Sequence, residues 1–344
     1  MSASKTPAKK AASASKAASA AAPVSAASPI LRVRDLRKYF QVARGSLHAV
    51  DDISFDIKKG KTLGMVGESG CGKSTTGRLL VRLHEATSGS IVYDGSEVTK
   101  ANDREMKTLR TRMQMIFQDP YSSINPRHTV ATIIGEPLKI HKKVSGNQEY
   151  EERVRKLMAT VGLADRLYDS YPHELDGGRR QRIGIARALA LDPEFIVCDE
   201  PVSALDVSIQ AQILNLLMDL QDKLGLTYLF ITHDLSVVKH ISDDIVIMYM
   251  GQIVERGPTE ELFAKPIHPY GRALLSAIPV PKLNARKERI ILKSEVSSPI
   301  NPKPGCRFAP RCIHAQPECS VADPALREVA PGRFVACRLA EQFV

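Results

Sequence analysis

The chain has 344 residues, of which 43% are hydrophobic, so it can bury a large core in one large or two small domains. Its formal net charge of +10 favours an anionic partner (a nucleotide, a nucleic acid or a membrane surface) without choosing among them. No stretch of about 18 uncharged apolar residues occurs, so we expect no helix to span a membrane.

The first 29 residues are rich in Ala, Ser and Lys and contain no aromatic residue. We expect residues 1–29 to form a disordered tail, because such a segment buries too little apolar surface to offset its ordering entropy. The tail has no continuous Leu- or Val-rich region, so we do not expect a signal peptide. We therefore expect the folded part of the chain to lie in the cytosol.

Two segments near the start alternate apolar and polar residues, which predicts antiparallel strands. They are ILRVRDLRKYF (residues 30–40) and AVDDISFDIKKG (residues 49–60). Residues 61–83 follow as a strand, a glycine-rich loop and a helix. Residues from Glu149 to Leu175 are charge-rich and have a helical period.

Two short, almost wholly apolar segments end in acidic residues, which is typical of buried parallel strands. They are FIVCDEP (residues 195–201) and YLFITHD (residues 228–234). IVIMYMGQIVERG (residues 245–257) predicts a hairpin around Gly251. The sequence then becomes Pro-rich and later Cys-rich, which predicts a small C-terminal extension over residues 259–344.

The sequence GESGCGKST fits the phosphate-loop pattern G-x-x-x-x-G-K-[ST], between a predicted strand and a predicted helix. Glycines let backbone N–H groups turn inward around the β- and γ-phosphates of ATP, Lys73 adds a positive charge, and the Ser74 hydroxyl binds Mg²⁺. A plain glycine-rich turn is the alternative, and the flanking elements disfavour it. The predicted nucleotide-binding residues here are Gly67, Glu68, Ser69, Gly70, Cys71, Gly72, Lys73, Ser74 and Thr75.

Two acidic residues end the strand FIVCDEP. Asp199 is placed to contact Mg²⁺, directly or through water, and Glu200 is placed to act as a base toward the attacking water. A solvated acidic turn is the alternative, which the neighbouring phosphate loop makes less attractive. His233 ends another buried strand, and this position alone suggests that it reaches the γ-phosphate.

Together these motifs resemble the ATP-binding subunits of ABC transporters, across residues 30–258. The resemblance implies an α/β P-loop NTPase fold with a RecA-like α/β core, an antiparallel β subdomain and an α-helical subdomain at about residues 119–180. It implies that Tyr39 stacks on adenine and that Gln118 of FQDP also binds Mg²⁺. It further implies that the catalytic residues are Lys73, Gln118, Glu200 and His233. The implied signature motif consists of Asp176, Gly177, Gly178 and Arg179, and the implied D-loop consists of Ser203, Ala204, Leu205 and Asp206.

The flanking sequences resemble the dipeptide/oligopeptide branch of importer ATPases. They are FQDPYSSINPRHTV (residues 117–130), HPYGRALLSAIPVP (residues 268–281) and GCRFAPRC (residues 305–312). The resemblance implies an ATP- and Mg²⁺-dependent ATPase that powers uptake of di- or oligopeptides, or of a related small solute, by a type I importer. The implied partners are a second ATPase subunit (identical or homologous), two membrane permeases and an extracytoplasmic solute-binding protein, with this subunit at the cytoplasmic face of the membrane.

Six cysteines divide into two groups. Cys71 and Cys198 fall in the phosphate loop and a buried strand and are expected to be packing thiols. The other four have the spacing C-x5-C-x6-C-x17-C, and the cytosol disfavours disulfides among them. Four thiolates can hold zinc or a [4Fe–4S] cluster, or the thiols can remain without a ligand. The resemblance favours a structural [4Fe–4S] cluster over zinc, at Cys306, Cys312, Cys319 and Cys337.

The family's signature motif reads LSGGQ, whereas this chain has LDGGR, with Asp176 in place of the serine. Asp is as good a helix N-cap as Ser, so the helix should form. Two negative charges about 4 Å apart, however, repel by roughly 4 kcal/mol at an effective dielectric constant of 20. Either the chain presents a weakened signature to its partner's ATP, or Arg179 and Arg180 compensate and the site hydrolyses normally.

Two other classes of function remain as alternatives. Some ABC ATPases act in DNA repair or translation, but these usually carry two nucleotide domains or a long coiled-coil insertion, and no nucleic-acid partner is expected here. The positive charge fits DNA, but no interleaving of aromatic and basic residues occurs. The second alternative is a regulatory subunit that binds ATP with little turnover.

Overall fold

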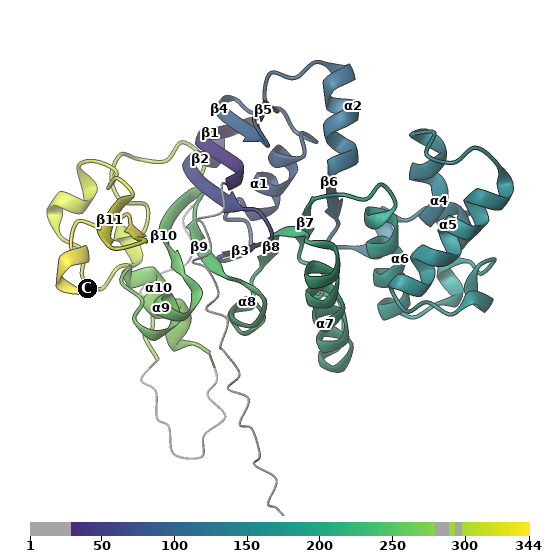
Figure 1. Cartoon of the computed structure of the whole chain (residues 1–344). Helices are drawn as coiled ribbons and strands as arrows, with labels where there is room; N and C mark the ends of the chain where they lie inside the picture. The colour runs from purple at the N-terminus through teal and green to yellow at the C-terminus, as the bar shows by residue number, and fades with distance from the viewer. Residues whose placement is uncertain (1–28, 279–288, 293–297) are drawn as a thin grey trace, which may run out of the picture.

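The computed structural model describes residues 29–278, 289–292 and 298–344 (Figure 1). The predicted disordered tail falls outside these residues except for Pro29. No helix within the described ranges is both long and apolar enough to cross a lipid bilayer.

An eight-stranded sheet crosses the described part of the molecule and contains β3 (Thr62–Val66), β6 (Met113–Ile116), β7 (Phe195–Asp199), β8 (Thr227–Thr232), β9 (Asp244–Tyr249), β10 (Gln252–Pro258), β11 (Arg327–Ala330) and β12 (Arg333–Val335). The strand order is β11-β12-β10-β9-β3-β8-β7-β6. The run from β9 to β6 is parallel, and β3, β7 and β8 are wholly buried, as their continuous apolar sequences predict. The hairpin predicted around Gly251 is confirmed as β9 and β10.

A four-stranded antiparallel sheet, in the order β2-β1-β4-β5, covers one side of the core. Its two long strands are the ones that the alternating segments near the start predict, and they pair along most of their length. The side chains that alternate inward from them join the core. The strands are β1 (Pro29–Val42), β2 (Gly45–Lys58), β4 (Ser88–Tyr93) and β5 (Ser96–Glu97).

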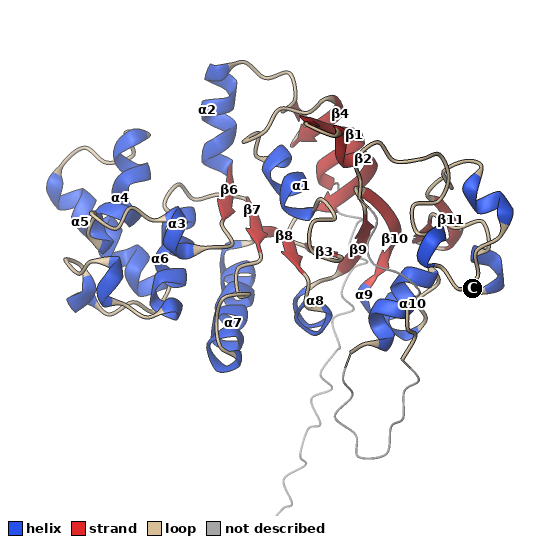
Figure 2. Cartoon of the chain, turned by 180° about the vertical axis from the view of Figure 1, so that it is seen from behind, coloured by secondary structure: helices blue, strands red, loops and turns tan. Residues whose placement is uncertain are grey.

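Helices cover both faces of the parallel part of the larger sheet, where β3, β7 and β8 are buried. On one side lie α1 (Lys73–Leu80) and α2 (Asp103–Arg112), and on the other lie α7 (Val207–Leu224) and α8 (Leu235–Ile241) (Figure 2). The antiparallel sheet packs on the same side as α1, in one apolar cluster with it.

A helical lobe stands beyond the β6 edge of the sheet. The segment from Glu149 to Leu175, for which the sequence predicts a helical period, is helical in α5 (Asn147–Thr160) and not continuously to its end. Gly162, at φ 71°, follows the first helix and ends it, and two short 3₁₀ helices occupy the rest. The helices of the lobe are α3 (Pro120–Ser123), α4 (Val130–Ile140), α5 (Asn147–Thr160) and α6 (Gly177–Leu189).

The predicted C-terminal extension lies at the opposite end of the sheet and contains α9 (Thr259–Ala264) and α10 (Pro269–Ser276). Its strand β12 pairs with β10, so the extension continues the core sheet. A buried ion pair crosses this junction, since Arg333 donates to the Glu255 carboxylate at 2.8 Å. A second link is the bridge between Leu47 and Ile300.

Gly64 permits the close packing of α8 on β3. A Cβ atom at Gly64 would lie 2.5 Å from Ser242 Oγ and 2.8 Å from Val238 Cγ1. Gly64→Ala should therefore lower the free energy of unfolding by about 1–3 kcal/mol. The helical Gly184 has open space around its Cβ position, so Gly184→Ala should raise stability by about 0.5–1 kcal/mol. Urea titrations of the two variants measure both effects, and equal midpoints would contradict the packing.

Candidate functional site

The phosphate loop runs from the end of β3 to the start of α1. Gly67, Gly70 and Gly72 have φ values of 156°, 76° and 106°, which L-residues with side chains rarely adopt. A Cβ at Gly67 would lie 2.3 Å from Met248 O, and one at Gly72 would lie 2.1 Å from Ala49 O. The glycines thus let the loop curl tightly at the N-terminus of α1.

Lys73 folds back into this loop. Its Nζ donates to the carbonyl oxygens of Gly67 and Glu68, at 2.8 and 3.0 Å, and the residue is only 4% exposed. The ammonium group therefore lies inside the loop, where it can meet a phosphate as a point charge.

Ser74 and Asp199 meet beside the loop, although they are 125 residues apart in the chain. The Ser74 hydroxyl donates to Asp199 Oδ1 at 2.7 Å, and no described residue hydrogen-bonds the buried Asp199 Oδ2. Burial raises the pKa of Asp199, with the Ser74 hydrogen bond opposing the shift. An unsatisfied carboxylate oxygen beside a hydroxyl is a donor set that fits Mg²⁺.

Glu200 lies at the centre of the polar end of the parallel strands. Gln118 Nε2 donates to Glu200 Oε2 at 2.9 Å, and His233 Nδ1 is 3.3 Å from the same oxygen. The backbone of Glu200 has a positive φ of 45°, and its N–H donates to the Ile231 carbonyl at 2.9 Å. The strand ends thus bring together three of the predicted catalytic side chains.

Tyr39 contacts an aromatic partner that our sequence prediction missed. The β1–β2 register pairs Tyr39 with His48, and their rings stack at a centroid distance of 3.9 Å. The Tyr39 hydroxyl donates to Asp51, and burial together with this bond raises the pKa of Tyr39 to about 12. The register of the predicted hairpin, which places residues 39 and 48 opposite each other, is the feature from which this ring contact could be predicted.

The predicted signature residues begin α6. Asp176 is the N-cap, and its Oδ1 accepts from the Arg179 N–H at 2.8 Å, which confirms the capping prediction. The Arg179 guanidinium lies 3.4 Å from Asp176 Oδ2. Gly178 packs closely, because a Cβ there would lie 2.7 Å from Ile209 Cγ2, and Gly177 lies near Leu205.

The prediction that Arg180 helps to neutralise the negative charge of Asp176 is wrong. Its side chain is buried, its Nε donates to the Pro172 carbonyl at 2.6 Å, and its guanidinium lies over the Tyr121 ring at 3.9 Å. Of these two arginines, only Arg179 is placed to neutralise the Asp176 carboxylate.

The predicted D-loop residues lead into α7. Asp206 caps that helix by accepting from the Ile209 N–H at 3.1 Å, and this bond lowers the pKa of Asp206. Ser203 donates to the Glu200 carbonyl at 3.1 Å, which joins this loop to the central carboxylate. The remaining two residues of the loop are Ala204 and Leu205.

The site residues thus fall into two spatial groups. The loop at α1, the Ser74–Asp199 pair and the Glu200 group cluster at one edge of the parallel strands. The signature residues belong to α6, which lies with α4 and α5 in the helical lobe (Figure 1).

The four cysteines of the extension line one small pocket, together with His268 and His314. They form no disulfide, and burial raises the pKa of the Cys306 thiol to about 11. Among the described residues, however, no group of three or more His, Cys, Asp or Glu side chains is placed to hold a metal ion. As predicted, Cys71 and Cys198 are buried packing thiols.

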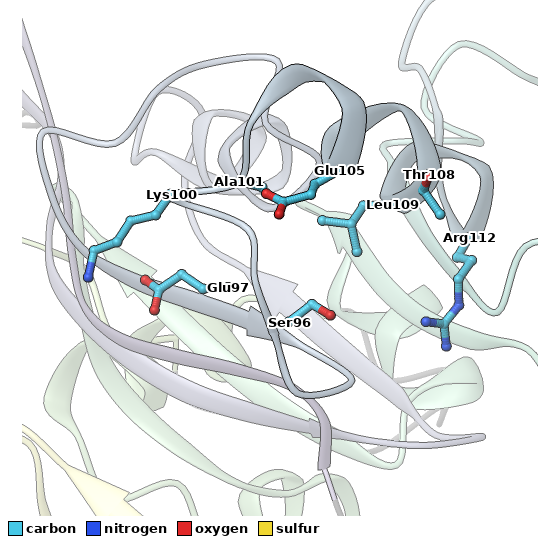
Figure 3. Close-up of a pocket in the computed structure, with 8 residues that line it drawn as sticks. All are labelled: Ser96, Glu97, Lys100, Ala101, Glu105, Thr108, Leu109 and Arg112. Atoms are coloured by element: carbon cyan, nitrogen blue, oxygen red, sulfur yellow. The ribbon is translucent and has the colours of Figure 1, made fainter.

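A larger cavity of about 550 Å³ lies between β5 and α2 and contains none of the predicted site residues (Figure 3). Glu97 and Glu105 face it together with Lys100 and Arg112, and Leu109 supplies an apolar wall. Because none of the predicted site residues line this cavity, it is not part of the site described above.

Comparison with known proteins accounts for most of the chain. The family model described as "ABC transporter" matches residues 50–203. The oligopeptide transport ATP-binding protein AppF of Bacillus subtilis is 50% identical over 320 residues, covering 90% of this chain and 97% of that protein. The chain therefore belongs to the ATP-binding proteins of ABC transporters.

The C-terminal extension narrows the assignment to the oligopeptide/dipeptide branch. The family model "Oligopeptide/dipeptide transporter, C-terminal region" matches residues 254–319. The dipeptide transport ATP-binding protein DppF of Haemophilus influenzae is 50% identical over 315 residues, covering 90% of this chain and 96% of that protein.

Solved structures agree with the fold. The ATP-binding cassette MJ0796, solved as a dimer in a post-hydrolysis state with ADP and phosphate, matches with a TM-score of 0.62 at 26% identity. That match covers 67% of this chain and 98% of the other. The cbiO1 protein of Clostridium perfringens matches with a TM-score of 0.61 at 28% identity, over 69% and 91% of the two chains.

Asp199→Asn tests the Mg²⁺ site. Because an amide is a weaker Mg²⁺ ligand than a carboxylate, the variant should bind ATP about 10- to 100-fold more weakly when Mg²⁺ is present. Titration calorimetry with and without a chelator measures this, and the difference should vanish in the chelator. Asp219→Asn, at an exposed position on α7, is the matched control and should bind normally. Equal Mg²⁺ dependence in both variants would contradict the assignment.

Proposed function

We propose that this chain is the ATP-hydrolysing subunit of a type I ABC importer, with di- or oligopeptides or a related small solute as cargo. The contact of Glu200 with both Gln118 and His233, beside the phosphate loop, carries the proposal. The names of the relatives, oligopeptide and dipeptide transport ATP-binding proteins, support the cargo class.

The geometry assigns a role to each group. Lys73 and the loop N–H groups hold the ATP phosphates, and Ser74 and Asp199 hold Mg²⁺. When bound, Mg²⁺ neutralises charge that develops on the phosphate oxygens. Glu200 orients the attacking water and accepts its proton. Gln118 and His233 fix the Glu200 carboxylate, and His233 is placed to contact the γ-phosphate.

The place of the signature residues in a separate lobe supports the presence of a second ATPase subunit. We propose that Asp176–Arg179 faces the ATP of that subunit. The ion pair between Arg179 and Asp176 supports the interpretation that the negative charge is compensated, since it places a cation beside the carboxylate. Arg179 is also half-exposed, so its guanidinium can reach a phosphate.

An apolar groove between the core and the helical lobe supports docking to the permeases. Phe117 and Pro137 line it, and Leu83 and Ile140 at its rim are 48% and 59% exposed. We propose that a cytoplasmic helix of one permease packs here, which places the subunit peripherally at the cytoplasmic face of the membrane. A solute-binding protein would deliver cargo from the other side.

Glu200→Gln in this subunit tests whether this chain's own site hydrolyses ATP and whether its signature motif supports hydrolysis in the partner's site. In the purified whole complex, the site that contains the substitution should keep ATP binding but hydrolyse ATP at least about 100-fold more slowly, because the amide cannot accept a proton. Any hydrolysis that remains comes from the site of the second ATPase subunit. Glu260→Gln, on the surface of α9, is the matched control.

Either outcome of that assay is informative. If hydrolysis vanishes, this chain's own site drives transport. If most activity survives, the partner's site hydrolyses ATP while facing Asp176, and the weakened-signature interpretation is wrong. ATP binding with no turnover in the native complex would instead favour a regulatory subunit, and salt-dependent DNA binding would favour a non-transport ATPase.

We propose further that the four cysteines hold a structural [4Fe–4S] cluster, with zinc as the second choice. Their shared pocket supports this, although the thiols would have to turn inward and lose their protons to act as ligands. ATP hydrolysis needs no electron transfer, so the role would be structural.

Metal analysis of anaerobically purified protein tests this proposal. About four iron and four sulfide per chain are expected for the cluster type. Cys319→Ser should lose the iron and lower the melting temperature, whereas Cys71→Ser in the phosphate loop should keep the iron. One zinc per chain would support the second choice, and protein free of both metals would show that the thiols carry no ligand.

A further inference from the structure

Glu68, the second residue of the phosphate loop, is bonded to the C-terminal extension. Its backbone N–H donates to the Tyr270 hydroxyl at 3.0 Å. Its carboxylate accepts from both terminal nitrogens of Arg311, at 2.8 and 3.2 Å. Its carbonyl accepts from Lys73. The amide, the carbonyl and both carboxylate oxygens of this one loop residue are therefore engaged.

Arg311 approaches Glu68 from a firmly packed position. Its side chain is 8% exposed, and the bidentate bond to Glu68 raises the pKa of Arg311. Beneath it the rings of Tyr270, Tyr249 and Phe308 pack against one another at centroid distances of 4.7 to 5.3 Å. The arginine is thus held in place before any nucleotide arrives.

The same stretch of the extension reaches the other side of the nucleotide site. Arg307 donates to Asp51 and to the Met250 carbonyl. Asp51 also accepts from Tyr39 and lies 3.0 Å from His48 Nδ1. Although burial favours the neutral acid, these hydrogen bonds and the Arg307 cation lower the pKa of Asp51.

On the basis of the proposed function, we infer that the C-terminal extension completes the nucleotide site of its own chain. Arg311 is a positioning residue for the phosphate loop, acting through Glu68, and Arg307 is a positioning residue for Tyr39, acting through Asp51. Arg311 also neutralises the Glu68 carboxylate, which would otherwise repel the phosphates of ATP. The extension therefore sets the affinity for ATP.

Arg311→Ala in the full chain should weaken binding of a non-hydrolysable ATP analogue with Mg²⁺ about tenfold, as measured by titration calorimetry. Arg311→Lys should recover part of the loss, because lysine restores the charge without the bidentate geometry. Arg327→Ala is the matched control, since Arg327 pairs with Glu341 inside the extension and should not alter the affinity.

Glu68→Ala separates positioning from a general loss of folding. In the Glu68→Ala background, Arg311→Ala should change the affinity less than twofold, because residue 68 then has neither the charge nor the oxygen atoms that Arg311 contacts. Melting temperatures without nucleotide identify any variant that is simply unfolded. An unchanged affinity in Arg311→Ala, or an equal loss in both backgrounds, would overturn the inference.

Lys73→Ala distinguishes failure of this inference from failure of the proposed function. The proposed function requires that the native chain binds the analogue and that Lys73→Ala does not. If both hold and Arg311→Ala binds as the native chain does, only the role of the extension is wrong. If Lys73→Ala binds normally, the nucleotide site itself is misassigned.

Discussion

A lysine ammonium that is removed from water has to be solvated by something else, and here the phosphate loop supplies that solvation. The carbonyl oxygens of Gly67 and Glu68 surround Lys73, which requires backbone angles that glycine adopts most easily. The loop can hold this shape only because its two ends are fixed, one at the end of β3 and the other at the start of α1. The buried parallel sheet fixes the positions of β3 and α1. The position of the positive charge therefore follows from the packing of the whole core.

The topology of the sheet places the acidic groups close to the Lys73 ammonium. In a parallel sheet the carboxyl ends of neighbouring strands lie at one edge, so β7 and β8 place Asp199, Glu200 and His233 beside a loop that leaves β3. Burial raises the pKa of Asp199, which means that the nucleotide-free site is electrostatically unfavourable for its carboxylate. Under the proposed function, Mg²⁺ bound there with ATP would offset that cost.

Local patterns in the sequence predicted what depends on local geometry. The glycine spacing of the phosphate loop, the apolar strands ending in acids and the hairpin at Gly251 are all present. The pairing of Arg311 with Glu68 could not be predicted, since 243 residues separate them and neither belongs to a periodic pattern. The place of Arg180 could not be predicted for a related reason, because the sequence alone does not show that this side chain, one turn from Asp176, is buried with its guanidinium over the Tyr121 ring.

The sheet junction has a consequence for the chain as a unit of folding. β10 lies between β9 and β12, and Glu255 is buried there with hydrogen bonds from Ile267, His268 and Arg333. A chain ending at Pro258 would expose the unpaired edge of β10 and would lack the donors and the packing that hold the Glu255 carboxylate. Open strand edges recruit other strands, so such a fragment would tend to self-associate. The catalytic core and its extension thus behave as one cooperative body, although their sequences match two separate family models.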